Sequence, residues 1–410
     1  MLPNQENTIL VTVQSLGAIA ATGAVLTVPT PAGFTYEAAW CTSATGGATC
    51  PASTTAQALT AGLTLPSVPP HGVLKFTLDG VTSPTAGPFV EFTATVNVVG
   101  DAVPVTNAAL LRSAVVMPAA STLVASVPAP TYPGGSPELE AFNWINAERA
   151  RCGLGLLKQD ARIDLASTDH ATYLATNLDS GNINQVAHQQ NPAFPAYTGL
   201  DATARAQVRG YSGPASDLLA QESTALLGYK IAFGYTSYQS LSAQGGAKDL
   251  GLASTKPSSS SAFVSVINVG VPAPSGSTST QLLEAQQQIA GDVVATYPCG
   301  GEVLIRRNHG QEDPSPLPNT DLSTKGPPIT IFVRAGQTFR LKEVLLTTAS
   351  GTVIGGHFLR NEDRPQNLTP SQAVFIPAAP LPANTTFNFL VSGTNDWQRF
   401  EKRITFSTGD

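Results

Sequence analysis

Few side chains in this chain of 410 residues can do chemistry at neutral pH. The sequence holds five histidines and four cysteines, and charged residues make up only 12% of it. No serine stands in a Gly-x-Ser-x-Gly pattern, no glycine-rich loop follows a strand and opens a helix, and there is no Cys-x-x-Cys pair. The sequence therefore lacks a hydrolase nucleophile elbow, a phosphate-binding loop and a dithiol redox motif.

The four cysteines fall two and two along the chain. Cys41 and Cys50 lie close together in the first part, whereas Cys152 and Cys299 lie in the middle part. Four cysteines allow three pairings, and separation into domains favours Cys41–Cys50 and Cys152–Cys299. Two disulfides are typical of an oxidising compartment, and four free thiols would indicate a cytosolic protein instead.

Residues 138–222 carry the strongest helical periodicity, and most remaining candidates lie on it or beside it. A first helix is predicted just after Ser136, whose hydroxyl can cap free amides and which is followed by proline and acidic residues. Its apolar stripe reaches Ile145 and continues at helical spacing with Asn146 and Arg149. Because buried polar groups need partners, we expect these two side chains to form a structural network with loop carbonyls or a carboxylate.

A second helix is predicted from about Asp160 to Asn177. His170 lies on its apolar face, between Ala166 and Leu174 in the helical repeat. We therefore expect a core histidine with one ring nitrogen hydrogen-bonded, rather than a ligand.

Two other histidines offer weaker cases. His309 stands close in sequence to Glu302, Glu312 and Asp313, and this charged stretch is interpreted as a solvated loop. His71 lies in a proline-rich turn, where we expect it to be exposed and without a role in a site.

The middle of the chain resembles the CAP superfamily in its bacterial form, the superfamily of cysteine-rich secretory, antigen-five and pathogenesis-related proteins. The resemblance covers roughly residues 137–318. It rests on motifs in a fixed order, namely Asn146-x-x-Arg149, Gly153-Leu154, Leu157, Ala187-His188-Gln189, Tyr197-Thr198-Gly199, Arg205, Arg209-Gly210-Tyr211 and Glu222. The resemblance implies an α–β–α sandwich, in which helices lie on both sides of an antiparallel sheet.

Further elements are expected within this middle domain. A third helical segment is predicted at 225–245, and KDLGLAS and AFVSVINVG are interpreted as a hairpin around the loop TKPSSSS. QLLEAQQQIAGDVV is interpreted as helical, and Val293–Tyr297 as the last strand of the domain.

The resemblance also implies a candidate cleft. In the superfamily, two histidines and two acidic residues line a cavity that can hold a divalent metal; His188 matches the first histidine and Glu222 the first acid. The second histidine belongs in a Tyr-His-Arg segment, where this chain has Tyr238 and Gln239. Because a catalytic zinc site uses about three protein ligands plus water, one imidazole and one carboxylate do not hold zinc tightly. We expect neither a metal nor another cofactor.

His188 with Glu222 could act as an oriented general base, since a carboxylate can fix the imidazole tautomer. No nucleophile accompanies them, so we expect a structural hydrogen bond between the two beneath a groove that binds a ligand without catalysis. Family members are reported to bind lipids, sterols or envelope components, which implies a lipid, an envelope component or a protein partner here. The alternatives are a weak hydrolase that uses His188 and Glu222, and a structural or adhesive surface component with the CAP-like module as a spacer.

Both flanks show short strands between turns. This pattern predicts a β-sandwich over residues 1–125, a linker over residues 126–136, and a second all-β domain over residues 326–410. The stretch PLPANTTFNFLVSG in the last of these resembles the Ig-like domain that often trails bacterial CAP domains. The stretch around Cys41 and Cys50 resembles an Ig-like repeat of bacterial surface proteins, in which such a pair staples one loop. The predicted fold class is thus multidomain: an all-β Ig-like sandwich, an α–β–α domain, and a second all-β Ig-like sandwich.

The charge and hydrophobicity of the whole chain limit its expected partners and location. A formal charge of −6 and the lack of a basic run argue against nucleic acid. No stretch is long and apolar enough to cross a bilayer, and residues 8–29 fail as a signal peptide because polar residues interrupt them and no Lys or Arg precedes them. We expect a secreted or cell-surface bacterial protein whose natural leader is absent from this chain. The sequence sets no oligomeric state.

Overall fold

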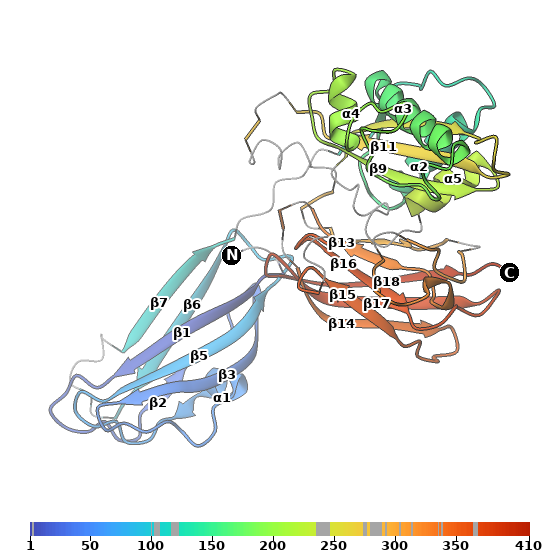
Figure 1. Cartoon of the computed structure of the whole chain (residues 1–410). Helices are drawn as coiled ribbons and strands as arrows, with labels where there is room; N and C mark the ends of the chain where they lie inside the picture. The colour runs from blue at the N-terminus through green and yellow to red at the C-terminus, as the bar shows by residue number, and fades with distance from the viewer. Residues whose placement is uncertain are drawn as a thin grey trace. The chain divides into compact units, whose positions relative to one another are not determined.

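The computed structural model describes every residue except 2–3, 100, 102–106, 116–122, 235–246, 274–276, 279–288, 292, 303–304, 313–314, 335, 338 and 364–367. Strands predominate over helices among the described residues (Figure 1). The chain divides into two compact units: residues 1–119 with 397–400 form the first, and residues 120–396 with 401–410 form the second.

The first unit is a sandwich of two sheets. One sheet contains, in order, β1 (Glu6–Gln14), β5 (Val73–Thr82) and β3 (Phe34–Thr45). The other contains β4 (Leu63–Thr64), β2 (Val25–Thr27), β6 (Phe89–Asn97) and β7 (Ala108–Ala114). Apolar side chains from both sheets meet in one core, where the rings of Phe34 and Phe92 pack edge to face with centroids 5.0 Å apart. The all-β sandwich predicted for this flank is confirmed, and it is compatible with an Ig-like fold.

A short helix and a disulfide complete this sandwich. The helix α1 (Ala56–Ala61) begins at Thr55, whose hydroxyl accepts a hydrogen bond from an amide of the first turn. The Cys41–Cys50 disulfide, with an S–S distance of 1.98 Å, joins β3 to the loop before α1. The predicted pairing of these two cysteines is confirmed.

The second unit contains a mixed central sheet. Its strands, in order, are β8 (Lys158–Gln159), β10 (Asp249–Thr255), β11 (Phe263–Gly270) and β9 (Ala215–Glu222). β11 is antiparallel to both of its neighbours, and β8 runs parallel to β10. The hairpin predicted around the TKPSSSS loop is therefore confirmed.

Helices lie against both faces of this sheet (Figure 1). They are α2 (Pro137–Arg151), α3 (Ala161–Asp179), α4 (Ala202–Val208) and α5 (Ala225–Gly234). Side chains of α2 and α5 share an apolar cluster with Ile267 of β11, whereas side chains of α3 pack with the adjacent residue Val266. Because successive residues of a strand point to opposite faces, these two clusters cover opposite sides of the sheet.

The helix boundaries follow from their caps. Ser136 caps α2, accepting a hydrogen bond from the amide of Leu139 at 3.1 Å, and Asp160 caps α3. Both predicted starts are confirmed. Of the third predicted helix, α5 accounts for residues 225–234, and the rest of that prediction lies outside the described residues, as does most of the helix predicted over QLLEAQQQIAGDVV.

The C-terminal strands form two more sheets, which belong to the second unit except for residues 398–400. One sheet holds β12 (Ala295–Tyr297), β13 (Ile329–Phe332), β16 (Gln372–Pro377) and β15 (Gly356–Arg360), and the other β14 (Phe339–Thr348), β17 (Thr386–Asn395) and β18 (Gln398–Ser407). A short 3-10 turn, η2 (Leu322–Thr324), precedes β13. The rings of Phe375 on β16 and Phe389 on β17 are 6.2 Å apart, which joins the two sheets face to face. This agrees with the predicted all-β flank.

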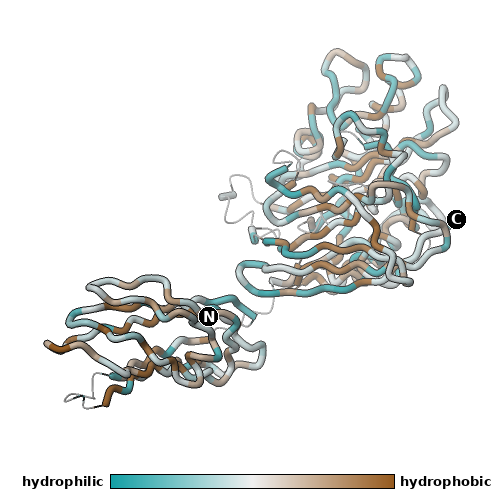
Figure 2. Tube along the Cα trace, turned by 90° about the horizontal axis from the view of Figure 1, so that it is seen from below, coloured by the Kyte–Doolittle hydropathy of each residue, from teal (hydrophilic) through white to brown (hydrophobic). Residues whose placement is uncertain are grey.

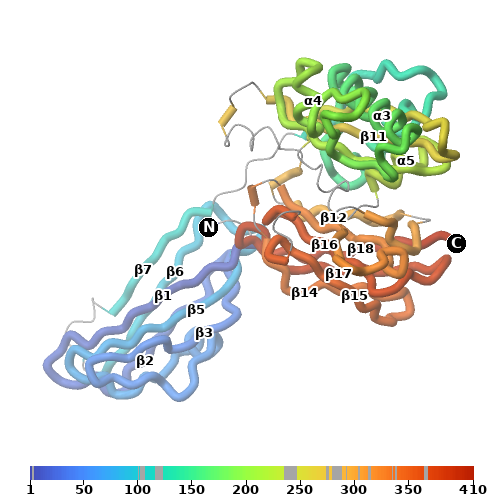
Figure 3. Tube along the Cα trace, in the orientation of Figure 1, coloured from blue at the N-terminus to red at the C-terminus, as the bar shows by residue number. Residues whose placement is uncertain are grey.

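Two segments contact other partners than those expected. The strand expected to end the middle domain is β12, which pairs with β13 in a C-terminal sheet that therefore begins at Ala295; Figure 3 shows β12 among the C-terminal strands. The predicted linker at 126–136 packs against the central core: Tyr132 donates a hydrogen bond to Asp164 at 2.5 Å and contacts the ring of Phe142. In both cases, the partners of the segment lie in distant parts of the chain, and the local sequence does not indicate them.

Hydrophobic residues, brown in Figure 2, occur along the strands of both units. Within the described residues, none of the helices has both the length and the apolar character needed to cross a membrane.

Candidate functional site

His188 and Glu222 lie on opposite faces of the central sheet. Nδ1 of His188, in the loop between α3 and α4, is 2.8 Å from Oδ1 of Asp217 on β9. Glu222 ends β9 five positions later, and its Cβ lies beside Gly228 of α5. An odd separation on a strand turns two side chains to opposite faces, here also about 17 Å apart along the strand. The predicted His188–Glu222 hydrogen bond is therefore wrong, and Asp217 takes the place given to Glu222. Tyr238 and Gln239 lie outside the described residues.

Asp217 is the centre of a buried polar cluster, called here the Asp217 cluster: Asp217, His188, His170, Arg205 and Gln190. Nη2 of Arg205 donates to Oδ2 of Asp217 at 2.5 Å, and Nη1 donates to the carbonyl of His188 at 3.1 Å. Arg205 and Asp217 are almost fully buried, with 0% and 7% of their side chains exposed, whereas 36% of the His188 side chain is exposed. His188 is thus the member through which the cluster reaches the surface.

His170 forms the inner layer of the cluster. Its Nε2 is 3.0 Å from the carbonyl of Ala187, and its Nδ1 is 3.0 Å from the side-chain amide of Gln190. The carbonyl requires a proton on Nε2, which leaves Nδ1 to accept from the Gln190 amide. The predicted core histidine is confirmed, with both ring nitrogens satisfied instead of one.

The electrostatics of the cluster favour a charged pair and a neutral inner imidazole. Burial, together with the nearby charge of Arg205, lowers the pKa of His170 to about 3, so this ring is neutral at physiological pH. Burial alone would raise the pKa of Asp217, but the hydrogen bond from His188 and the positive charges around it hold that pKa below its usual value. Arg205 and Asp217 therefore compensate each other inside the fold, which a buried charge requires.

The loop between α3 and α4 places His188. The side-chain oxygen of Gln190 accepts a hydrogen bond from the backbone amide of Thr198 at 2.8 Å, and the backbone amide of Gln190 donates to the carbonyl of Leu200 at 2.9 Å. At Gly199 an added Cβ would lie 2.8 Å from the amide nitrogen of Arg205, so only glycine allows this close approach. The Tyr-Thr-Gly segment thus has a mechanical role in holding α4 and its arginine in place.

Asn146 and Arg149 behave as the helical pattern predicts. The Asn146 amide donates to the carbonyl of Leu157 at 3.0 Å and its oxygen accepts from the Leu157 amide at 2.8 Å, while Nε of Arg149 donates to the carbonyl of Gly155 at 2.7 Å. Burial lowers the pKa of Arg149 to about 9. These side chains fasten the turn after α2 and do not reach the Asp217 cluster.

The interpretation of the His309 region as a solvated loop is wrong. His309 is 1% exposed, and its Nε2 lies 3.6 Å from a carboxylate oxygen of Glu312. Glu302 is also buried, where it accepts hydrogen bonds from the amides of Cys299 and Gly300. Asp313 lies outside the described residues. His71 is exposed, as expected.

The Cys152–Cys299 disulfide, with an S–S distance of 2.19 Å, confirms the second predicted pairing and joins the end of α2 to the segment after β12. Among the described residues, Cys152, Cys299 and Glu302 form the group whose ligand atoms come close enough to share a metal ion. Because both sulfurs are bonded to each other, this group offers no thiolate, and its single carboxylate does not suffice for a metal site.

A second set of polar contacts, which the sequence did not reveal, lies around β10. Glu138 accepts hydrogen bonds from the hydroxyls of Tyr229 at 2.9 Å and Ser254 at 2.6 Å. Asp164, which accepts from Tyr132, also accepts from the amide of Leu252 at 3.0 Å. These contacts join α2, α3 and α5 to β10 and to the segment that precedes α2. We therefore assign them a role in the stability of the module.

The Asp217 cluster is suited to present one oriented imidazole. A carboxylate bonded to Nδ1 selects the tautomer in which Nε2 carries the lone pair, and it strengthens Nε2 as a hydrogen-bond acceptor and base. All four cysteines are in disulfides, so no thiol nucleophile is present. The arrangement supports recognition of a polar group at His188 more directly than it supports covalent catalysis.

Sequence reasoning named His188, His170 and Arg205 but missed how they meet. Asp217 stands in the strand ASDLLAQE, where its parity matches that of Leu219, whose side chain packs on the α3 cluster. An acid at an inward position of a strand is the one local signal, because a buried carboxylate needs a cationic partner. Gln190 carries no comparable signal.

Comparisons with known proteins assign no family. No family model matches the chain, and no curated protein matches it. Among solved structures, it is similar at 6% identity and a TM-score of 0.19 to the C-terminal domain of the Streptococcus agalactiae AgI/II polypeptide BspA, covering 100% of this chain and 94% of that one. A putative beta-galactosidase from Bacteroides fragilis gives 7% identity and a TM-score of 0.20, covering 100% and 72%. Similarities this weak support no conclusion about fold or function.

Proposed function

We propose that α2 to β11 form a CAP-like module that binds a ligand without catalysis, in a bacterial protein that works outside the cell or at its surface. The ordered motifs from Asn146 to Arg209 support the CAP-like assignment, as do helices on both faces of the central sheet. The two disulfides and the low share of charged residues support the location. The β-sandwich flanks suit a protein that presents a binding module.

The observation that carries the proposal is the Asp217 cluster. Four of its five members are nearly or fully buried, and their charges and hydrogen bonds converge on the one partly exposed member, His188. Burying Arg205 and Asp217 carries a desolvation cost of several kcal/mol per ion, roughly, that their attraction has to offset. A fold that needed only stability would gain as much from apolar residues at these positions, so the pair is best explained by the imidazole that it orients.

The expected ligand has a hydrogen-bonding polar group for His188, such as the hydroxyl of a lipid, a sterol or a cell-envelope component. An oriented neutral imidazole can accept from a hydroxyl, and its protonated form can donate to an oxyanion.

The proposal is tested by native mass spectrometry of the full chain purified from cells, with extraction and identification of any bound small molecule. The His188→Ala variant should lose the bound molecule. His357→Ala is the matched control, because His357 is an exposed histidine on β15, and it should retain the wild-type occupancy.

Equal occupancy in wild type, His188→Ala and His357→Ala would show that the Asp217 cluster is not the binding site. Conversion of the bound molecule to a hydrolysis product, absent in His188→Ala, would replace binding by hydrolysis as the function of this site.

A further inference from the structure

The first unit has an apolar groove on one open side. β1 and β7 are the outer strands of their sheets, and between them lies a groove of about 760 Å³. The opposite side is different, because α1 packs there against β3 and β4. β1 lines the groove with Ile9–Gln14 and β7 lines it with Ala108–Leu111.

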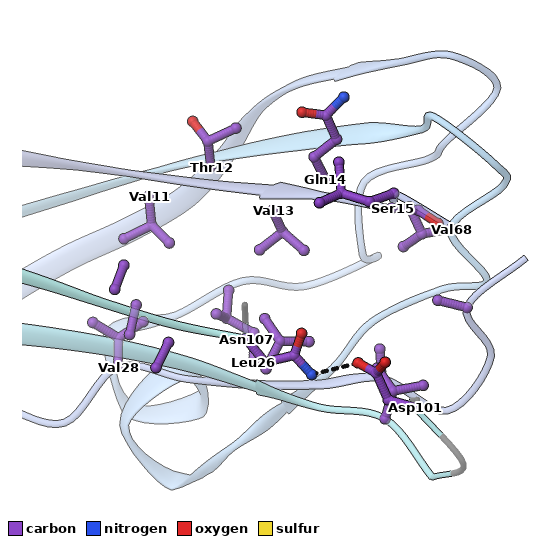
Figure 4. A pocket seen from close by; sticks show the side chains of 18 of the residues that line it. Val11, Thr12, Val13, Gln14, Ser15, Leu26, Val28, Val68, Asp101 and Asn107 are labelled. Carbon is purple, nitrogen blue, oxygen red and sulfur yellow. Dashed lines mark hydrogen bonds between the residues drawn. The ribbon is translucent and has the colours of Figure 1, made fainter. Parts of the chain in front are cut away.

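Inward side chains of both outer strands are left partly uncovered in this groove. Figure 4 shows Val11 and Val13 of β1 pointing into it, above Leu26 and Val28. On β7, Leu111 pairs directly with the buried Phe92, so it faces inward, yet it remains 50% exposed. Apolar residues at core positions of a sandwich are normally covered, so this side is incomplete as a core.

The groove is also almost without charge. Of the described residues that line it, Asp101 is the one ionisable group, and it accepts a hydrogen bond from Asn107 at 2.7 Å. No basic side chain among them could hold a carboxylate or a phosphate. An anionic lipid or a fatty acid therefore lacks a partner for its head group, and a neutral occupant is favoured.

The outer edge of β7 favours a polypeptide strand over other neutral occupants. An edge strand presents a row of backbone N–H and C=O groups along which another strand can pair. β7 is seven residues long, about 23 Å at the usual rise per residue, and six of the seven are exposed. An acyl chain would cover the apolar floor but would leave these backbone groups unused, whereas a polypeptide strand uses both.

We infer that this groove accepts an extended, uncharged polypeptide segment of a partner, which pairs with β7 and inserts alternate apolar side chains between the two sheets. The segment would cover Leu111 and Val13 and would complete the sandwich on its open side. This inference concerns the first unit alone and does not depend on the function proposed for the Asp217 cluster.

The test uses the full chain and a fluorescently labelled synthetic peptide, KKTVTVTVTKK, whose valines alternate. Its control, KKTTVVVTTKK, has the same composition without the alternation. Fluorescence anisotropy should show binding of the alternating peptide at least about tenfold tighter than that of the control, a difference of about 1.4 kcal/mol. Hydrogen exchange should show slower exchange of the β7 amides when the alternating peptide is bound.

Two apolar residues of the same sheet provide matched variants. Leu111→Asp places a charge on the inward face and should weaken binding at least about tenfold, while Phe89→Asp, on the outward face of β6 and away from the groove, should leave it unchanged. Leu111 and Phe89 are 50% and 44% exposed, so neither substitution empties a core. Thermal unfolding of both variants checks that the first unit stays folded.

Three results would overturn the inference: equal or no binding of the two peptides, equal effects of the two aspartates, or peptide binding that leaves exchange of the β7 amides unchanged. Binding of dodecanol without peptide binding would assign the groove to an acyl chain instead.

Discussion

The most informative substitution in the central module is Asp217→Asn. It keeps the size of the side chain and removes the charge that compensates Arg205, which is 0% exposed and whose Nε already lacks a hydrogen-bond partner among the described residues. Removing one partner of a buried ion pair costs about 3–5 kcal/mol, because the other charge is left uncompensated. We expect a loss of that size in the unfolding free energy of the module.

A surface pair provides the scale for comparison. Asp169 and Arg209 make an equally short contact, at 2.5 Å, but 38% of the arginine side chain is exposed. Exposed pairs contribute little to stability because water and salt screen their charges, so Asp169→Asn should change stability far less than Asp217→Asn. Because both substitutions replace Asp by Asn, the difference between their effects on stability measures the contribution of burial.

The assay is urea unfolding read by hydrogen exchange of the α3 and β9 amides. This readout reports the central module even when the sandwiches unfold separately. A double variant, Arg205→Met with Asp217→Asn, should recover most of the lost stability, because it removes the uncompensated charge. The reasoning would be refuted by an Asp217→Asn loss no larger than that of Asp169→Asn, or by a double variant less stable than Asp217→Asn alone.

Two further predictions concern pH and the disulfides. The pKa of His170 is about 3 in the fold, against 6.5 for an unperturbed imidazole. As the pH falls, the unfolded chain therefore binds this proton first, and the free energy of unfolding decreases from about pH 6.5 toward pH 3. His170→Gln should flatten that part of the pH dependence, measured by urea unfolding. The Cys152–Cys299 disulfide spans 147 residues and Cys41–Cys50 spans 9, so on the loop-entropy model replacing each pair by serines should cost about 5 and about 3 kcal/mol. Equal losses in the two serine variants, measured by chemical denaturation, would contradict the loop-length argument.

The local sequence was sufficient to predict several structural features. Ser136 and Asp160 cap the two long helices where the pattern predicts, and Asn146 and Arg149 bond the loop carbonyls that their place on a buried stripe requires. These features depend on neighbours a few residues away, whose spacing the sequence states directly. Both disulfides were also predictable, because four cysteines divided between separate parts of the chain leave one economical pairing.

Pairings across the fold were not predictable in the same way. The segment around Val293 reads equally well as the last strand of one sheet or the first of the next, and only the register with β13 settles the choice. Tyr132 lies in a stretch rich in proline and glycine, yet a half-buried carboxylate on α3 holds it against the core. The local amino-acid composition gives no indication of either partner, β13 or the carboxylate on α3.

The candidate site shows the same division. The resemblance of the motifs to the CAP superfamily singled out His188 and implied Glu222 as the acid that orients it. Which acid it meets was decided by the tertiary structure, because β9 turns Asp217 and Glu222 to opposite faces and α4 brings Arg205 onto the first of them. A pairwise contact between distant segments depends on strand register and face, and a single sequence specifies these only through the folded chain as a whole.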